Sequence, residues 1–165
     1  MSRITVNIPE AVNGDYEIKV IDGYTNLLKN GEVLMYDTEL EYSQHQPLWD
    51  DATGDVLIGG LGIGMVNQKL MDNPNVTSVT IIEKNQEVID LVWPHCPKDN
   101  TFTLINADIT EWTPTQNYDY IWLDTWCTVL QSRDFGDYNT DLYNRFKSYT
   151  PKIGAWLLPA SSSTS

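Results

Sequence analysis

The feature that most constrains the fold is residues 55–65, "DVLIGGLGIGM", where an apolar run opens into four glycines. The run predicts a buried strand, and the residues after Gly64 predict a helix. Glycines at such a junction let a ligand approach the backbone N–H groups at the helix start. The stretch therefore favours a loop that binds a nucleotide or nucleoside, with a purely structural turn as the alternative.

The spacing of the glycines narrows the choice of loop. Gly60, Gly62 and Gly64 form a G-x-G-x-G series, and the dinucleotide motif would need a small residue where Met65 stands. No Gly-Lys-Ser/Thr sequence follows, which argues against a P-loop. The spacing thus disfavours the two commonest phosphate-binding loops.

Strand and helix patterns alternate through residues 51–160, which is typical of βαβ units and a parallel sheet. The expected strands are 55–60, 76–83, 102–108, 118–124 and 154–159. The expected helices are 64–73, 85–93, ended by Pro94, and 137–150. We assign residues 51–160 to one α/β domain and residues 161–165 to a polar tail.

Residues 1–50 have a different pattern, typical of β-hairpins. Residues 3–9 and 16–22 alternate apolar and polar side chains at the strand period. Asn30-Gly31, between two apolar runs, predicts a tight hairpin turn because this pair accepts positive φ. A short helix with Leu40, Gln44 and Leu48 at helical spacing is expected to stop near Pro47.

Acidic residues end three successive strands of the expected parallel sheet: Glu83, Asp108 and Asp124. Ligands of open parallel sheets bind at the carboxyl ends of the strands. Glu83 stands nineteen residues after Gly64, where a carboxylate can accept both hydroxyls of a ribose. The alternative for Glu83 is an acid favoured by the dipole of the helix that follows it. Asp108 lies where it could meet an adenine amino group.

The series "VLIGGLGIG", "TIIE", "INAD" and "YDYIWLD" resembles the class I S-adenosylmethionine (SAM)-dependent methyltransferase superfamily. It looks most like the spermidine synthase branch, the polyamine aminopropyltransferases, which carry a β-hairpin domain before the glycine loop. The resemblance covers about residues 16–158 and includes "TELEYSQ" as the segment before the loop. It implies a Rossmann-like sheet, truncated at the C-terminus and preceded by a small β-hairpin region.

The resemblance also implies roles for individual residues. The cofactor, SAM or decarboxylated SAM, would be held by the loop glycines, a ribose-binding acid and an adenine-binding acid, namely Gly60, Gly62, Gly64, Glu83 and Asp108. Asp124 matches the catalytic acid that takes part in deprotonating an attacking amine. Tyr42 and Gln44 match the substrate side. Trp126, with Asp134 and Tyr138, could hold a cationic acceptor, although packing is the alternative role for Trp126.

Two departures from the aminopropyltransferase pattern bear on the reaction. Ile63 stands where that family has a loop acid, and Asp124 is followed by Thr125-Trp126-Cys127 without a second acid. Cofactor binding is compatible with both changes. Methyl transfer and aminopropyl transfer therefore both stay open.

Composition limits the partners. A net charge of −13 and a pI of about 4.2 repel phosphate backbones, so nucleic acid is not expected as a partner. The charge suits a cationic small-molecule acceptor, although it also serves solubility. The two cysteines and two histidines lack metal-ligand spacing, so no metal is expected and packing is their expected role. Without a signal or membrane span, we expect a cytoplasmic protein.

Two classes of function follow from these patterns. The first is a SAM-dependent transferase acting on a small, cationic acceptor by methyl or aminopropyl transfer. The second is a non-catalytic module that holds the nucleoside or a partner subunit, and an unpaired parallel edge strand predicts a homodimer. A Rossmann-like enzyme using another nucleotide is the weakest reading because of Met65.

Overall fold

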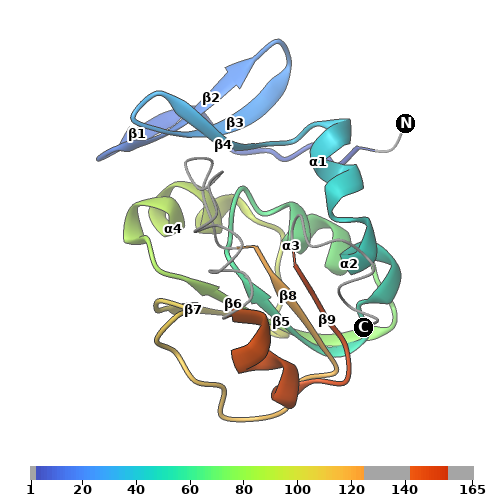
Figure 1. Ribbon diagram of the computed structural model, residues 1–165. Coiled ribbons are helices and arrows are strands. Elements are labelled where there is room, and N and C mark those ends of the chain that lie inside the picture. The colour runs from blue at the N-terminus through green and yellow to red at the C-terminus, as the bar shows by residue number, and fades with distance from the viewer. Residues whose placement is uncertain (1–2, 125–141, 156–165) are drawn as a thin grey trace.

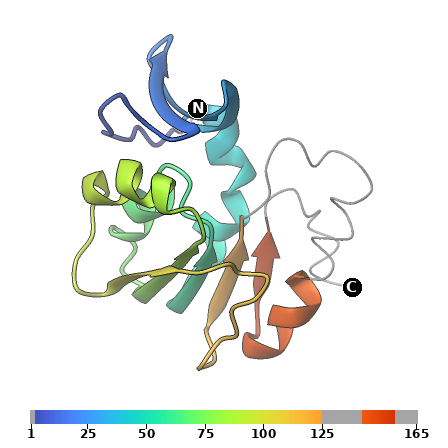
Figure 2. The same cartoon turned by 90° about the vertical axis from the view of Figure 1, so that its left-hand side faces the viewer.

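The computed structural model describes residues 3–124 and 142–155, which form two β-sheets joined by short helices. A four-stranded antiparallel sheet comes from the N-terminal region, and a five-stranded parallel sheet comes from the rest (Figure 1). The strands of the parallel sheet run toward the antiparallel sheet, so their carboxyl ends face it (Figure 2).

The antiparallel sheet consists of β1 (Ala11–Asn13), β2 (Tyr16–Ile21), β3 (Tyr24–Lys29) and β4 (Glu32–Tyr36), paired in chain order. The hairpin expected at Asn30-Gly31 is confirmed. Both residues have positive φ, 51° and 84°, which a two-residue turn of this kind requires. The strand expected over residues 3–9 is wrong, because these residues lie in no strand.

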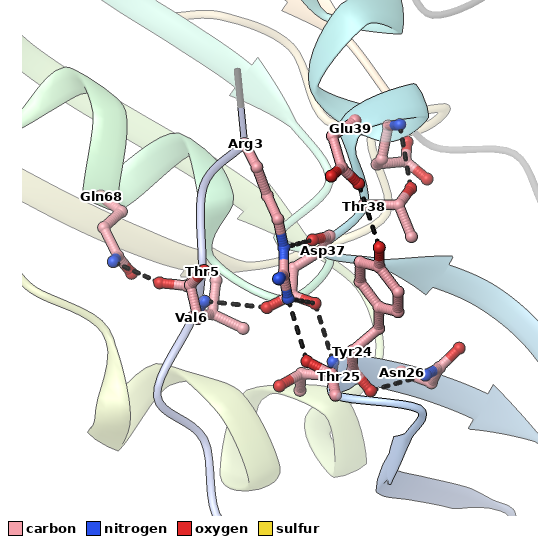
Figure 3. A network of polar contacts seen from close by, with 12 residues as sticks. Arg3, Thr5, Val6, Tyr24, Thr25, Asn26, Asp37, Thr38, Glu39 and Gln68 are labelled. Atoms are coloured by element: carbon pink, nitrogen blue, oxygen red, sulfur yellow. Dashed lines mark hydrogen bonds and ion pairs between the residues drawn. The ribbon is translucent and has the colours of Figure 1, made fainter. Parts of the chain in front are cut away.

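Residues 3–8 instead follow an extended path in which side-chain groups satisfy the backbone (Figure 3). The buried carboxylate of Asp37 accepts hydrogen bonds from Arg3 Nη2 at 3.1 Å, Val6 N at 3.0 Å and Thr25 N at 2.7 Å. On the other side, Gln68 Nε2 donates to the carbonyl oxygen of Thr5. Alternating apolar residues of this segment pack into the core, which explains its strand-like pattern.

Two short helices, α1 (Glu39–Gln44) and α2 (Gln46–Asp51), connect the sheets. The side chain of Thr38 caps α1 by accepting from Glu41 N. The expected short helix is present as α1, which ends at Gln44, but Pro47 does not stop the helical path, because α2 follows. Pro47 lies in the first turn of α2, where its missing N–H would have no helical partner. His45 is the residue between the two helices.

The parallel sheet contains β5 (Gly54–Gly59), β6 (Val76–Glu83), β7 (Phe102–Asn106), β8 (Tyr120–Leu123) and β9 (Ile153–Ala155). Their spatial order, β7-β6-β5-β8-β9, reverses direction between β5 and β8. The Rossmann-like sheet and the preceding antiparallel region are therefore confirmed. The reversal makes the carboxyl ends of β5 and β8 the place where such sheets bind ligands.

The helical segments after β5 follow the expected order. They are α3 (Met65–Leu70), α4 (Gln86–Val92), η1 (Trp93–His95), residues 142–146 and η2 (Lys147–Tyr149). The α-helix α4 ends at Val92, two residues before Pro94, as expected, and the chain continues in the short 3-10 helix η1, which contains Pro94 in its first turn. In the described ranges no helix is both long and apolar enough for a membrane span.

Apolar side chains cover both faces of the parallel sheet. Val56 and Ile58 of β5 join the larger core with α2–α4 and the N-terminal region, whereas Leu57 faces the opposite side. There it packs in one cluster with Phe146, and the helical residues 142–149 lie across the sheet from α4 (Figure 2). The boundary at residues 50/51 stays a prediction, since α2 runs across it.

Candidate functional site

The glycine loop adopts backbone angles that other residues rarely adopt. Gly60, Gly62 and Gly64 have φ of 112°, 56° and 78°. A Cβ on Gly62 would collide with Met35 Sδ, and one on Gly64 would lie 2.5 Å from Cys96 Sγ. Glycine at 62 and 64 is thus favoured by the backbone angles and the packing of the protein itself, in addition to any ligand.

The loop is hydrogen-bonded to the carboxyl ends of both neighbouring strands. On the β6 side, Leu61 N donates to Glu83 Oε1 at 2.9 Å and Gly60 N donates to the carbonyl oxygen of Ile82 at 2.8 Å. On the β8 side, Asp124 N donates to the carbonyl oxygen of Gly59 at 2.7 Å. The structure therefore brings the loop, Glu83 and Asp124 together at the point where the strand order reverses.

Glu83 is held by main-chain groups. Its Oε1 accepts from Leu61 N, and its Oε2 accepts from the N–H of Asn85, the N-cap residue of α4. Burial raises the pKa of Glu83, and the two backbone hydrogen bonds act in the opposite direction. The bond to Asn85 matches the helix-start role that the sequence offered as an alternative. Since each carboxylate oxygen can accept two hydrogen bonds, both oxygens keep capacity for hydroxyl donors.

Asp108 follows β7 and is fixed by a local turn. Its Oδ1 accepts from Thr110 N at 2.9 Å and from Thr110 Oγ1 at 2.6 Å. The hydroxyl of Thr110 is the main reason that the pKa of Asp108 lies below its ordinary value. Asp108 therefore presents an ionised, half-buried carboxylate beyond the end of β7.

Asp124 contacts a histidine that the sequence analysis assigned to packing. His45 Nε2 lies 2.9 Å from Asp124 Oδ2, and the imidazole is wholly buried. Its Nδ1 lies 2.8 Å from the main-chain carbonyl oxygen of Glu41. The ring packs between the indoles of Trp49 and Trp122, with centroids 5.5 and 5.4 Å away. The structure thus adds His45 to the candidate site.

Glu41 completes this group and was also missed. Its carboxylate is buried, with Oε2 3.7 Å from His45 Nδ1. Burial, aided by the negative charge of Asp124, raises the pKa of Glu41 to about 7, against the opposing effect of His45. The spacing Glu41-x-x-x-His45 puts both residues on one helical face. This spacing can be recognised in the sequence alone. No pattern in the sequence links them to Asp124, 79 residues after His45.

Of the residues predicted for the substrate side, Tyr42 and Gln44 lie on α1, the helix that carries Glu41, and the others lie outside the described ranges. The Tyr42 ring packs against Trp49 at 5.7 Å, with Lys69 Nζ 5.6 Å from its centroid. Gln44 is half-buried at the end of α1. Trp126, Asp134 and Tyr138 lie outside the described residues. Ile63, at the position of the family's loop acid, is wholly buried in the larger core.

The sulfur and imidazole groups offer no metal site in the part of the chain that the structure describes. No group of three histidine, cysteine or acidic side chains there is arranged for a metal ion. Cys96 is buried, which raises the pKa of its thiol to about 12. His95 is exposed in η1. Cys127 lies outside the described residues.

Comparison with solved structures supports the fold. No protein-family model and no curated protein matches the sequence. The N-methyltransferase NodS from Bradyrhizobium japonicum WM9 matches with a TM-score of 0.52 at 14% identity, over 69% of this chain and 64% of that one. Its complex with S-adenosyl-L-homocysteine also gives 0.52, over 69% of this chain and 58% of that one, at 14% identity.

A probable spermidine synthase from Corynebacterium glutamicum ATCC 13032 matches with a TM-score of 0.55 at 16% identity. The match covers 79% of this chain and 56% of that one. The chain thus spans 56 to 64% of the length of these structures. These likenesses show that the chain has the class I methyltransferase fold.

Proposed function

We propose that the carboxyl edge of the parallel sheet binds SAM and that the protein transfers an alkyl group from it to a small cationic acceptor. One observation carries this proposal. The hydrogen bonds of Leu61 to Glu83 and of Asp124 to Gly59 place one acidic side chain on each side of the glycine loop, at the reversal of strand order.

The residues at this edge fit the parts of the cofactor. Glu83 retains acceptor capacity for ribose hydroxyls, and Asp108 offers an ionised carboxylate for the adenine amino group. The glycine loop, in which Gly60 has φ of 112°, would follow the methionine part. When bound, SAM supplies an alkyl group that is already activated by its sulfonium charge. The protein then has to align the donor and acceptor and exclude water.

The charge of the edge favours an amine as acceptor. Asp124 is 17% exposed, so its carboxylate can meet an acceptor at this edge. An ammonium acceptor must lose a proton before its nitrogen attacks, and Asp124 is the group placed to take that proton. The net charge of −13 favours the approach of a cation. Because a buried aliphatic side chain, Ile63, replaces the loop acid, we favour methyl transfer over aminopropyl transfer.

Isothermal titration calorimetry with SAM, methylthioadenosine and NAD tests the binding step. We expect binding of both sulfur nucleosides and none of NAD. Glu83→Gln should weaken SAM binding at least tenfold, about 1.4 kcal/mol, whereas Glu32→Gln, an exposed change at the start of β4, should leave it unaltered. Binding of NAD alone, or of no nucleoside, would overturn the proposal.

Turnover with a set of diamines and polyamines, followed by product mass, tests the transfer step. A mass increase of one methyl group supports the reaction that we favour, and an aminopropyl increase corrects its type. Nucleoside binding without any product would support a non-catalytic binding module. Sedimentation of the same sample tests the homodimer, which remains a prediction.

A further inference from the structure

His45 is the buried titratable group that the proposed reaction does not yet use. It is 0% exposed, although burial of an imidazole without partners is unfavourable. It lies between α1 and α2, and its side chain makes no capping hydrogen bond to α2, whereas Nδ1 lies 2.8 Å from the carbonyl oxygen of Glu41 in α1. Indole rings contact it from α2 and β8, through Trp49 and Trp122. The unfavourable burial of the imidazole must therefore be offset by its polar contacts.

The two hydrogen bonds of the ring determine where its protons can be. Nδ1 faces the carbonyl oxygen of Glu41, which can only accept, so Nδ1 carries a hydrogen. Nε2 faces Asp124 Oδ2 at 2.9 Å, and one proton must lie between these two atoms. The pair is therefore either an imidazolium with a carboxylate or a neutral imidazole with a carboxylic acid.

The surrounding charges select the first arrangement. Burial alone lowers the pKa of His45, but Asp124 and then Glu41 outweigh it, so the pKa lies above its ordinary value. In the described ranges, the charged groups that face the ring are Glu41 from α1 and Asp124 after β8, while α2 and β8 present indoles. A cationic ring paired with the Asp124 carboxylate, with the carboxyl group of Glu41 beside it, is the arrangement that this environment favours.

We propose that His45 is a positioning residue whose imidazolium holds Oδ2 of Asp124, so that Oδ1 is the oxygen that meets the amino group of the acceptor. Among the described residues no group is bonded to Oδ1. The ring is itself fixed by the Glu41 carbonyl and two indoles, which limits rotation of the Asp124 carboxylate. This inference rests on the proposed transfer reaction for its catalytic consequence, but the ion pair itself does not.

The first test is nitrogen-15 NMR of the histidine rings in the unaltered protein, which needs no cofactor. The chain has two histidines, and exposed His95 gives the reference signal, with His95→Asn completing the assignment. We expect both ring nitrogens of His45 to carry a proton at pH 7. In Asp124→Asn, Nε2 should lose its proton at lower pH. An unprotonated Nε2 at pH 7 in the unaltered protein would overturn the proposal.

The second test separates positioning from folding. His45→Gln should lower kcat by about 10- to 100-fold and leave the Kd for SAM within threefold, because the nucleoside contacts lie on the other side of the loop. His95→Asn should change neither quantity. An unchanged kcat in His45→Gln would contradict the positioning role. If the unaltered protein does not bind SAM, the proposed function is refuted, whereas the NMR result on the His45–Asp124 ion pair still holds.

Discussion

The two sides of the glycine loop hold their acidic residues in different ways. On the side of the loop next to β6, the β6 flank, Glu83 is fixed by the main-chain N–H groups of Leu61 and Asn85. On the β8 flank, Asp124 is fixed by the side chain of His45, which has Glu41 beside it. One carboxylate is thus anchored by groups that do not titrate, and the other belongs to a cluster that does.

This difference separates binding from chemistry. Main-chain donors fix Glu83 from Leu61 and Asn85, which suits an acceptor of ribose hydroxyls. The β8 flank contains three ionisable groups in contact, so its charge changes with pH, which suits a proton-transfer site. Variants of the two flanks, and of the segment that leads into α1, test that division.

The largest effect is expected at Asp124 itself. Asp124→Asn keeps the size of the side chain and removes the base, so kcat should fall by about 10²- to 10⁴-fold. Steady-state kinetics with the amine identified by product mass gives the measurement. Asp72→Asn, on the exposed surface after α3, is the matched control and should keep full activity. A fall of less than fivefold would remove Asp124 from the mechanism.

The next effect concerns the stability contributed by the polar network around Asp37. Asp37 lies just before α1, is fully buried, and accepts hydrogen bonds from Arg3, Val6 and Thr25. Asp37→Ala leaves these donors unpaired and should lower the free energy of unfolding by about 3 kcal/mol. Urea denaturation measures it, with exposed Asp15→Ala as the control. A loss below about 1 kcal/mol would show that the network in Figure 3 contributes little.

The β8 flank should also give stability a distinctive pH dependence. The folded protein keeps a proton on Glu41 up to about pH 7, whereas the unfolded chain loses it near its ordinary value of 4.5. The folded state thus binds more protons in this window, so the contribution of Glu41 to stability falls as the pH rises.

Glu41→Gln removes that contribution and tests its sign. Relative to the unaltered protein, the variant should gain on the order of 1 to 3 kcal/mol in unfolding free energy between about pH 4.5 and pH 7. Urea titrations across this range measure the difference, with exposed Glu32→Gln as the control. A difference that does not change with pH would contradict the raised pKa of Glu41.

The smallest effect is expected at the start of the helix that carries Glu41. Thr38 Oγ1 accepts from Glu41 N at 3.2 Å, and Thr38→Ala should destabilise the protein by about 1 kcal/mol. Thr103→Ala, at an exposed position of β7, controls for the general effect of losing a threonine. If Thr38→Ala destabilises the protein no more than Thr103→Ala does, the Thr38 cap does not stabilise the helix that carries Glu41.

The sequence predicted the β6 flank better than the β8 flank, for a physical reason. The glycine loop, β6 and Glu83 follow one another within thirty residues, so strand period and glycine spacing place them together. His45 and Asp124 meet only because the antiparallel sheet and α1 pack over the carboxyl ends of the strands, and no local pattern encodes that contact. The extended segment at residues 3–8 was misread because its alternation reflects burial without strand pairing.

The division between the two flanks is tested most directly by calorimetric titration of SAM into the Asp124→Asn protein. The account predicts a Kd within about threefold of the unaltered protein, a difference below about 0.7 kcal/mol, since the proposed nucleoside contacts come from the β6 flank. Glu83→Gln, titrated in parallel, should lose at least tenfold in affinity. An equal loss of affinity in both variants would contradict the division.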